Sequence, residues 1–243
     1  MANLGSTASA AAITAYDSST TQHHELGAEF NDKWGRTFRY VKAGAANLVA
    51  GNYLQGPAQV TTHQTMTPTA AAIGATSVSA TLGSTNAVTA NQYAGGFLVV
   101  DTTPGNGYAY VIKSHPAAAG SAACVFTLDE PLKVALTSSS RVSLMRNPYD
   151  GVIQSPITTL TGPPVGVAVF PIPAGEYGWI QTKGVAPALV AGTPAVGSTV
   201  GLPGSAAGAA VIDGAATSGL VIVGVVAHVG ADGLNKPTLI NFP

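Results

Sequence analysis

The sequence predicts an all-β protein, folded as a sandwich or barrel of many short antiparallel strands. Short runs rich in valine, isoleucine, threonine and aromatic residues recur along the chain of 243 residues. Glycine, proline, asparagine and aspartate separate these runs at spacings of about 8–12 residues, which is typical of β sandwiches and barrels. The periodicity of an amphipathic helix is nearly absent. Together these observations favour strands over helices throughout.

The chain carries little charge, and the two signs nearly cancel. Lysine and arginine number 10 against 11 aspartates and glutamates, and charged residues make up 9% of the sequence, where an average soluble domain has roughly 25%. Such a chain has no positive field to attract nucleic acid, and its single cysteine, Cys124, excludes a disulfide framework. So low a charge predicts assembly with partner molecules or, alternatively, a hydrated surface of serine and threonine.

Residues 1–22 are small and polar, and we expect them to form a flexible N-terminal arm. They lack the basic and apolar regions of a signal peptide. The most apolar run, residues 220–229, is well short of the ~20 residues of a membrane helix. Its valine and isoleucine content suits a buried strand instead, so no membrane partner is expected.

Residues 23–42 concentrate charged and aromatic side chains, with seven of the 21 charges of the chain. Residues 36–42 alternate polar with aromatic or β-branched residues, which predicts a half-buried strand. Residues 33–35 before it are typical of a turn. Aromatic residues interleaved with arginine are common at protein interfaces, although lysine and arginine also protect exposed edge strands.

The middle of the chain shows the clearest strand pattern. Asn106-Gly107 predicts a hairpin turn between two of the strands, and residues 147–151 form a strong turn cluster. From residue 43 to residue 148 we expect strands at 48–50, 53–55, 59–66, 75–82, 96–100, 108–112, 124–128 and 140–145. In the last third we expect them at 165–170, 177–182, 188–190, 211–212, 220–227 and 238–242.

A faint internal echo suggests how the chain is divided. Residues 44–51 resemble residues 184–192, although chance competes with duplication in so alanine-rich a sequence. If the echo is real, the flanking segments are related parts of one β domain and the middle is an insertion. The predicted division is a flexible arm, a main β domain, and a second β unit, at residues 1–22, 23–67 with 148–243, and 68–147 respectively.

Motifs that carry catalysis are missing from the sequence. It contains no nucleophile elbow, phosphate-binding loop or dinucleotide fingerprint. His23 and His24 are adjacent, so on an extended chain they point to opposite faces and do not readily share a metal ion. Asp129-Glu130 resembles a solvated turn, and Cys124 a buried structural thiol. We therefore predict no enzymatic activity, catalytic residue, metal or cofactor.

The candidate functional residues are those suited to contact a partner or another subunit. They are aromatic, histidine and arginine side chains, most of them in the charged segment. Trp179 and Tyr177 could also line a sugar site, although a core or inter-subunit position is the more common use of such residues. The candidates are His23, His24, Phe30, Trp34, Arg36, Arg39, Tyr177 and Trp179.

Two segments resemble structural proteins of tailed bacteriophages. The first contains Leu26-Gly27, the run Gly35-Arg36-Thr37-Phe38-Arg39-Tyr40-Val41-Lys42-Ala43-Gly44, and then Leu48 and Gly51. The second is Gly175-Glu176-Tyr177-Gly178-Trp179-Ile180-Gln181-Thr182-Lys183-Gly184. The similarity covers both ends of the chain and is weaker in the middle.

The resemblance implies a capsid decoration, or cement, protein. Such proteins bind the outside of the mature shell, often as trimers, and stabilise it by clamping the major capsid protein. The expected location is therefore the exterior of the virion, after synthesis in the host cytoplasm. No catalytic residue follows from such a family. The alternatives are a tail or fibre component and a glycan-binding module for attachment to the host.

Overall fold

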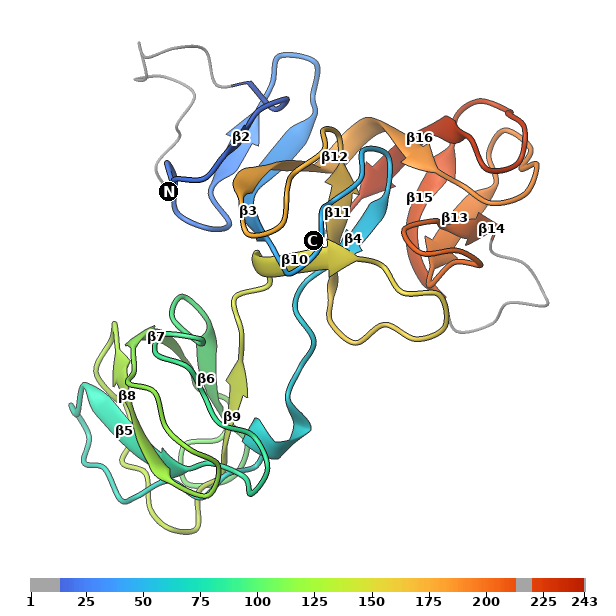
Figure 1. Ribbon diagram of the computed structural model, residues 1–243. Helices are drawn as coiled ribbons and strands as arrows, with labels where there is room; N and C mark the ends of the chain where they lie inside the picture. The colour runs from blue at the N-terminus through green and yellow to red at the C-terminus, as the bar shows by residue number, and fades with distance from the viewer. Residues whose placement is uncertain (1–13, 213–219, 243) are drawn as a thin grey trace. The chain divides into compact units, whose positions relative to one another are not determined.

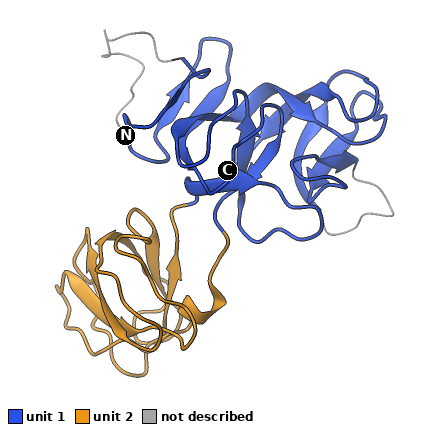
Figure 2. Cartoon of the chain, viewed as in Figure 1, with its two compact units in different colours: residues 1–57, 148–243 blue, residues 58–147 orange. Residues whose placement is uncertain are grey.

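The computed structural model describes residues 14–212 and 220–242 (Figure 1). The chain divides into unit 1, residues 1–57 and 148–243, and unit 2, residues 58–147 (Figure 2). The described residues form strands, with one short 3-10 turn at Thr61–His63, which confirms the predicted all-β class. None of their helical segments has the length and apolar character needed to span a membrane.

Unit 1 contains a closed five-stranded barrel. Around the ring, β3 pairs with β12, β12 with β11, β11 with β4, β4 with β10, and β10 again with β3. All these pairs are antiparallel except β10 with β3. The strands are β3 (Thr37–Ala43), β4 (Tyr53–Gln55), β10 (Asp150–Gln154), β11 (Pro164–Ala168) and β12 (Tyr177–Leu189). Buried aliphatic side chains, including Val41, Leu54, Val152 and Ile180, form one core cluster of these strands.

The second half of β12 leaves the barrel and organises a further layer of sheet. From Lys183 onward it pairs with β16 (Asn235–Asn241), and the sheet continues through β15 (Val221–Val226) and β13 (Thr199–Leu202) to β14 (Val211–Ile212). The pairing of β12 with β3 shifts register between Gln181 and Lys183. There the buried Gln181 amide donates hydrogen bonds to the Lys183 and Val185 carbonyls, both at 2.9 Å. This side chain thus satisfies backbone acceptors at the irregular point of the ladder.

The N-terminal segment packs against unit 1. Strand β1 (Ser18–Ser19) pairs with the start of β12, and Ala15 is buried beside Phe38, Tyr40 and Trp179. These contacts correct the expected flexible arm of residues 1–22 in its described part, because backbone pairing and apolar burial hold residues 15–19 in place. Residues 1–13 lie outside the described residues.

Unit 2 is a five-stranded sheet with its own core. Its order is β5 (Ser77–Thr81), β8 (Ala123–Leu128), β7 (Ala109–Ser114), β6 (Phe97–Val100) and β9 (Val142–Met145). Met66 bridges to Val142 in β9 and Pro68 bridges to Ala80 in β5, so the segment before β5 joins the two edge strands. Core side chains include Leu98, Ile112, Phe126 and Leu144.

Several local expectations differ from the structure. Residues 59–66 contain the 3-10 turn instead of a strand and belong to unit 2, which begins at residue 58 instead of 68. Strand β10 begins inside the expected turn cluster, with Gly151 at a φ of 90° that glycine readily adopts. Strand β13 was not expected. The two echo segments differ as well, because residues 184–189 are strand and residues 44–51 are mostly the loop between β3 and β4.

Candidate functional site

The eight candidate residues all lie in unit 1, around the β2–β3 hairpin and the strand β12. Strand β2 (Glu29–Asn31) pairs with β3, and β3 pairs with β12 from Lys42 opposite Tyr177 to Thr37 opposite Lys183. Two segments far apart in the sequence therefore form one hydrogen-bonded structure.

An aromatic cluster occupies one face of this structure. The Trp179 side chain is only 4% exposed, and its ring centroid lies 5.1 Å from that of Tyr40, 5.2 Å from that of His24 and 5.9 Å from that of Phe30. Tyr177 stacks on Tyr40 at 6.1 Å. Trp179 therefore acts as a core residue, and the sugar site considered for it from the sequence is wrong because the ring is covered.

The two adjacent histidines make separate contacts. The His23 ring forms a hydrogen bond of 3.1 Å with the Ser19 hydroxyl, and its backbone N–H donates to the Tyr40 hydroxyl. His24 instead packs edge-on against the Tyr40 ring. Within residues 14–212 and 220–242, no group of three histidine, cysteine, aspartate or glutamate side chains is arranged to hold a metal ion.

The tip of the β2–β3 hairpin exposes an aromatic side chain among cations. Trp34 is 72% exposed, with the Lys33 ammonium 4.6 Å from its ring centroid. Arg36 forms an ion pair of 2.6 Å with Asp32 and donates a hydrogen bond of 3.2 Å to the hydroxyl of Tyr16, which is 47% exposed. Desolvation acts to raise the pKa of Asp32, but hydrogen bonds from Arg36 and Trp34 outweigh it and hold this pKa below its ordinary value. These contacts hold a rigid exposed patch, the hairpin-tip patch of Tyr16, Lys33, Trp34 and Arg36.

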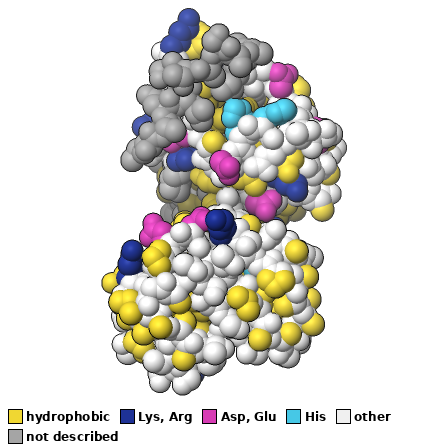
Figure 3. All heavy atoms as spheres, turned by 90° about the vertical axis from the view of Figure 1, so that its left-hand side faces the viewer, with side chains coloured by type: hydrophobic (Ala, Val, Ile, Leu, Met, Phe, Trp, Pro, Cys, Tyr) yellow, Lys and Arg dark blue, Asp and Glu magenta, His cyan; other side chains and the backbone are white. Residues whose placement is uncertain are grey.

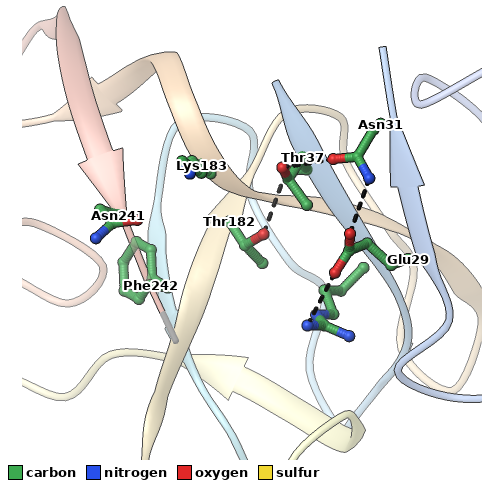
Figure 4. Close-up of a pocket in the computed structure, with 8 residues that line it drawn as sticks. Glu29, Asn31, Thr37, Thr182, Lys183, Asn241 and Phe242 are labelled. Atoms are coloured by element: carbon green, nitrogen blue, oxygen red, sulfur yellow. Dashed lines mark hydrogen bonds and ion pairs between the residues drawn. The ribbon is translucent and has the colours of Figure 1, made fainter. Parts of the chain in front are cut away.

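A polar groove of about 320 Å³ lies next to this hairpin (Figure 4). Arg39 lines it and pairs with Glu29 at 3.1 Å, while a second Arg39 nitrogen donates to the Gly27 carbonyl at 2.9 Å. Because side chains alternate along β3, Arg39 and Thr37 face away from the aromatic cluster. The residues around the groove are Glu29, Asn31, Thr37, Arg39, Thr182, Lys183, Asn241 and Phe242.

Elsewhere the surface carries few charges. On the face shown in Figure 3, lysine, arginine, aspartate and glutamate side chains occur singly or in small groups among larger uncharged areas. The hairpin and the groove bring together Lys33, Arg36, Arg39 and Lys183 with their acidic neighbours Glu29 and Asp32.

Unit 2 contains a buried histidine network that sequence spacing did not reveal. The His63 ring forms a hydrogen bond of 2.6 Å between Nδ1 and the Tyr93 hydroxyl, and its other nitrogen bonds to the Asn86 carbonyl at 3.1 Å. His115 Nε2 accepts the Tyr93 backbone N–H at 3.0 Å, and its Nδ1 lies 2.8 Å from the Pro116 carbonyl. Since a carbonyl can only accept and a backbone N–H can only donate, His115 donates a hydrogen bond from Nδ1 and accepts one at Nε2, and His63 donates a hydrogen bond from Nε2. Burial lowers the pKa of His115.

The other two polar features noted in the sequence lie in unit 2. Cys124 is buried, as predicted, and burial raises the pKa of its thiol, so the reactive thiolate form is disfavoured. Asp129 and Glu130 are exposed beyond the end of β8. Neither arrangement resembles a catalytic site.

Comparisons with protein family models, with curated proteins and with solved structures gave no match to this chain.

Proposed function

We propose that this protein is a decoration protein of a tailed bacteriophage, which binds the outer surface of the mature capsid and stabilises it. The observation that carries the proposal is the pairing of the two phage-like segments. They meet as β3 and β12, and the hairpin that begins at β2 presents the exposed Trp34. The proposed partner is the major capsid protein, contacted from the exterior of the virion by a homotrimer.

The hairpin-tip patch has the composition of an interface hot spot. Tryptophan, tyrosine and arginine dominate binding energies at protein interfaces. Here the Arg36 side chain is held by Asp32 and Tyr16, so little side-chain freedom remains to be lost on binding. A ligand that binds only the mature shell stabilises it by mass action, so chemistry is unnecessary for this function.

The proposal is tested by co-sedimentation of the purified protein with expanded and unexpanded capsids. We expect saturable binding to expanded capsids only. Trp34→Ala should weaken this binding by at least about tenfold, because truncating a hot-spot residue costs about 2 kcal/mol or more. The matched control is Tyr108→Ala, which removes an exposed aromatic ring from unit 2 and should leave capsid binding unchanged.

Three results would count against the proposal. Absence of binding to either capsid form would exclude the decoration function, and labelling of the tail instead of the head would favour a tail component. Equal binding by the Trp34→Ala variant and the wild type would reject the hairpin-tip patch as the contact surface. Circular dichroism of each variant shows whether weaker binding reflects the loss of a contact or the loss of the fold.

A further inference from the structure

We infer that the polar groove of unit 1 is a binding site for an acidic sugar, such as a uronic or sialic acid residue of a surface glycan. This activity goes beyond capsid decoration and does not depend on it. The groove has about 320 Å³ of space, at the lower end of the volumes of small-ligand sites.

The pairing register of four strands brings the polar side chains of the groove together. Asn31 lies opposite Thr37, Thr37 opposite Lys183, and Lys183 opposite Asn241, so a row of polar residues crosses four neighbouring strands. Directly opposed residues carry their side chains on the same face of a sheet, close together. The Thr37 hydroxyl donates to Asn31 at 2.7 Å, and the Asn31 amide donates to Glu29 at 2.8 Å. The row is therefore held in place before a ligand arrives.

The charges of the groove favour an anionic ligand. Two cations, Arg39 and Lys183, line it against one carboxylate, Glu29, which already pairs with Arg39. Lys183 has no carboxylate within 4 Å in the part of the chain that the structure describes. Arg39 Nε is shielded from solvent and, among the described atoms, has no hydrogen-bond partner. Because Arg39 Nε is shielded, the group that the groove offers to a ligand carboxylate is the Lys183 ammonium.

The remaining groups suit a sugar better than a peptide. Asn241 offers amide donors and an acceptor, Asn31 has a second amide N–H beyond the one that bonds Glu29, and the Thr37 oxygen can accept, which suits the neighbouring hydroxyls of a pyranose ring. A peptide bound to a sheet normally pairs with the backbone of an edge strand. Here β3, β12 and β16 already have partners on both sides, so another strand could pair only with β2, an edge strand of three residues. We therefore favour recognition by side chains of a polar, carboxylate-bearing ring.

The test is a chemical-shift titration of the full-length ¹⁵N-labelled protein with glucuronate, N-acetylneuraminate and neutral glucose. We expect saturable shifts at groove residues with at least one acidic sugar, and binding of glucose about tenfold weaker, because a charge-assisted hydrogen bond is lost. Lys183→Gln should weaken binding of the acidic sugar by a similar factor. Lys113→Gln removes an exposed lysine from unit 2 and should have no effect.

The same experiment can overturn the inference. Lack of saturable shifts with both acidic sugars at tens of millimolar would exclude the site. Equal affinities for glucose and glucuronate, or for the Lys183→Gln variant and the wild type, would refute the role of the charge. Tighter binding of a hexaglutamate peptide at the same residues would assign the groove to an acidic protein partner. Because capsids are absent from this titration, its outcome is independent of the decoration function.

Discussion

Both units bury an apolar core with β strands, but they place their polar side chains differently. Unit 2 buries a network of His63, Tyr93 and His115 within its fold, where every ring nitrogen has a partner. Unit 1 buries Lys236, whose ammonium donates to the Val190 carbonyl, but keeps other charged side chains near its surface, at the hairpin-tip patch and the groove. Buried polar side chains whose hydrogen bonds are all formed within the core stabilise the fold. Polar side chains that remain accessible, such as Lys183, are available to bind a partner.

The largest expected loss of stability follows from truncating a side chain of the aromatic cluster of unit 1. Trp179→Ala should destabilise unit 1 by about 3–5 kcal/mol, because a buried ring is lost and a cavity remains. Hydrogen exchange would show weaker protection of β3 and β12, with the amides of unit 2 as the internal control. Equal loss of protection in both units would break the comparison, because the two would then unfold as one cooperative body.

A smaller loss of stability is expected when a hydrogen bond of the buried histidine network of unit 2 is removed. Tyr93→Phe removes the hydroxyl that bonds to His63 Nδ1 while keeping the ring, so a buried ring nitrogen loses its partner. The expected cost is about 1–3 kcal/mol, measured by urea denaturation. Tyr108→Phe, at an exposed position, is the matched control. If both variants are equally stable, the network contributes nothing that water cannot replace.

The third effect is a pH dependence confined to unit 2. The pKa of His115 is lower in the folded state than its ordinary value of 6.5 because of burial, so the unfolded chain binds the proton more readily. The stabilisation is complete above about pH 6.5 and is lost as pH falls through the lower folded pKa, with a slope of at most about 1.4 kcal/mol per pH unit.

Denaturation of the wild type and of His115→Gln between pH 7.5 and about pH 4.5 measures this contribution as the difference in slope. His115 packs near Cys124 and Phe126, and its ring bonds to backbone groups of Tyr93 and Pro116, so its contacts among the described residues include no charged side chain that would stabilise the proton. A variant with the same pH slope as the wild type would assign the acid sensitivity to other groups.

Local sequence patterns predicted most of the fold. Alternation identified β3, and the Asn106-Gly107 turn identified the β6–β7 hairpin, because both signals lie within a few residues. The barrel closure could not be predicted, since it depends on β10 pairing with β3 across about a hundred residues. Strand β10 was hidden because Asp150-Gly151 has the composition of a turn.

The candidate site was predicted by composition but not by arrangement. Trp34 and Trp179 look equivalent in the sequence, yet one is exposed at a hairpin tip and the other is covered by the N-terminal segment. The groove depends on the register of four strands, so Asn31, Lys183 and Asn241 give no local signal. The histidine network likewise joins residues that only tertiary packing brings together.

Unit 2 is inserted between two strands of unit 1 that are direct neighbours. The chain leaves unit 1 after β4 and returns at β10, and these two strands are direct partners, with Gln55 opposite Ile153. At Gly56 the backbone runs so close to Pro148 that an added Cβ would stand 2.7 Å from its carbonyl oxygen. The exit and the return are therefore adjacent, and any module whose own ends lie together fits between them. Unit 1 is thus a scaffold into which another module, for example a chosen peptide, can be inserted in place of residues 58–147.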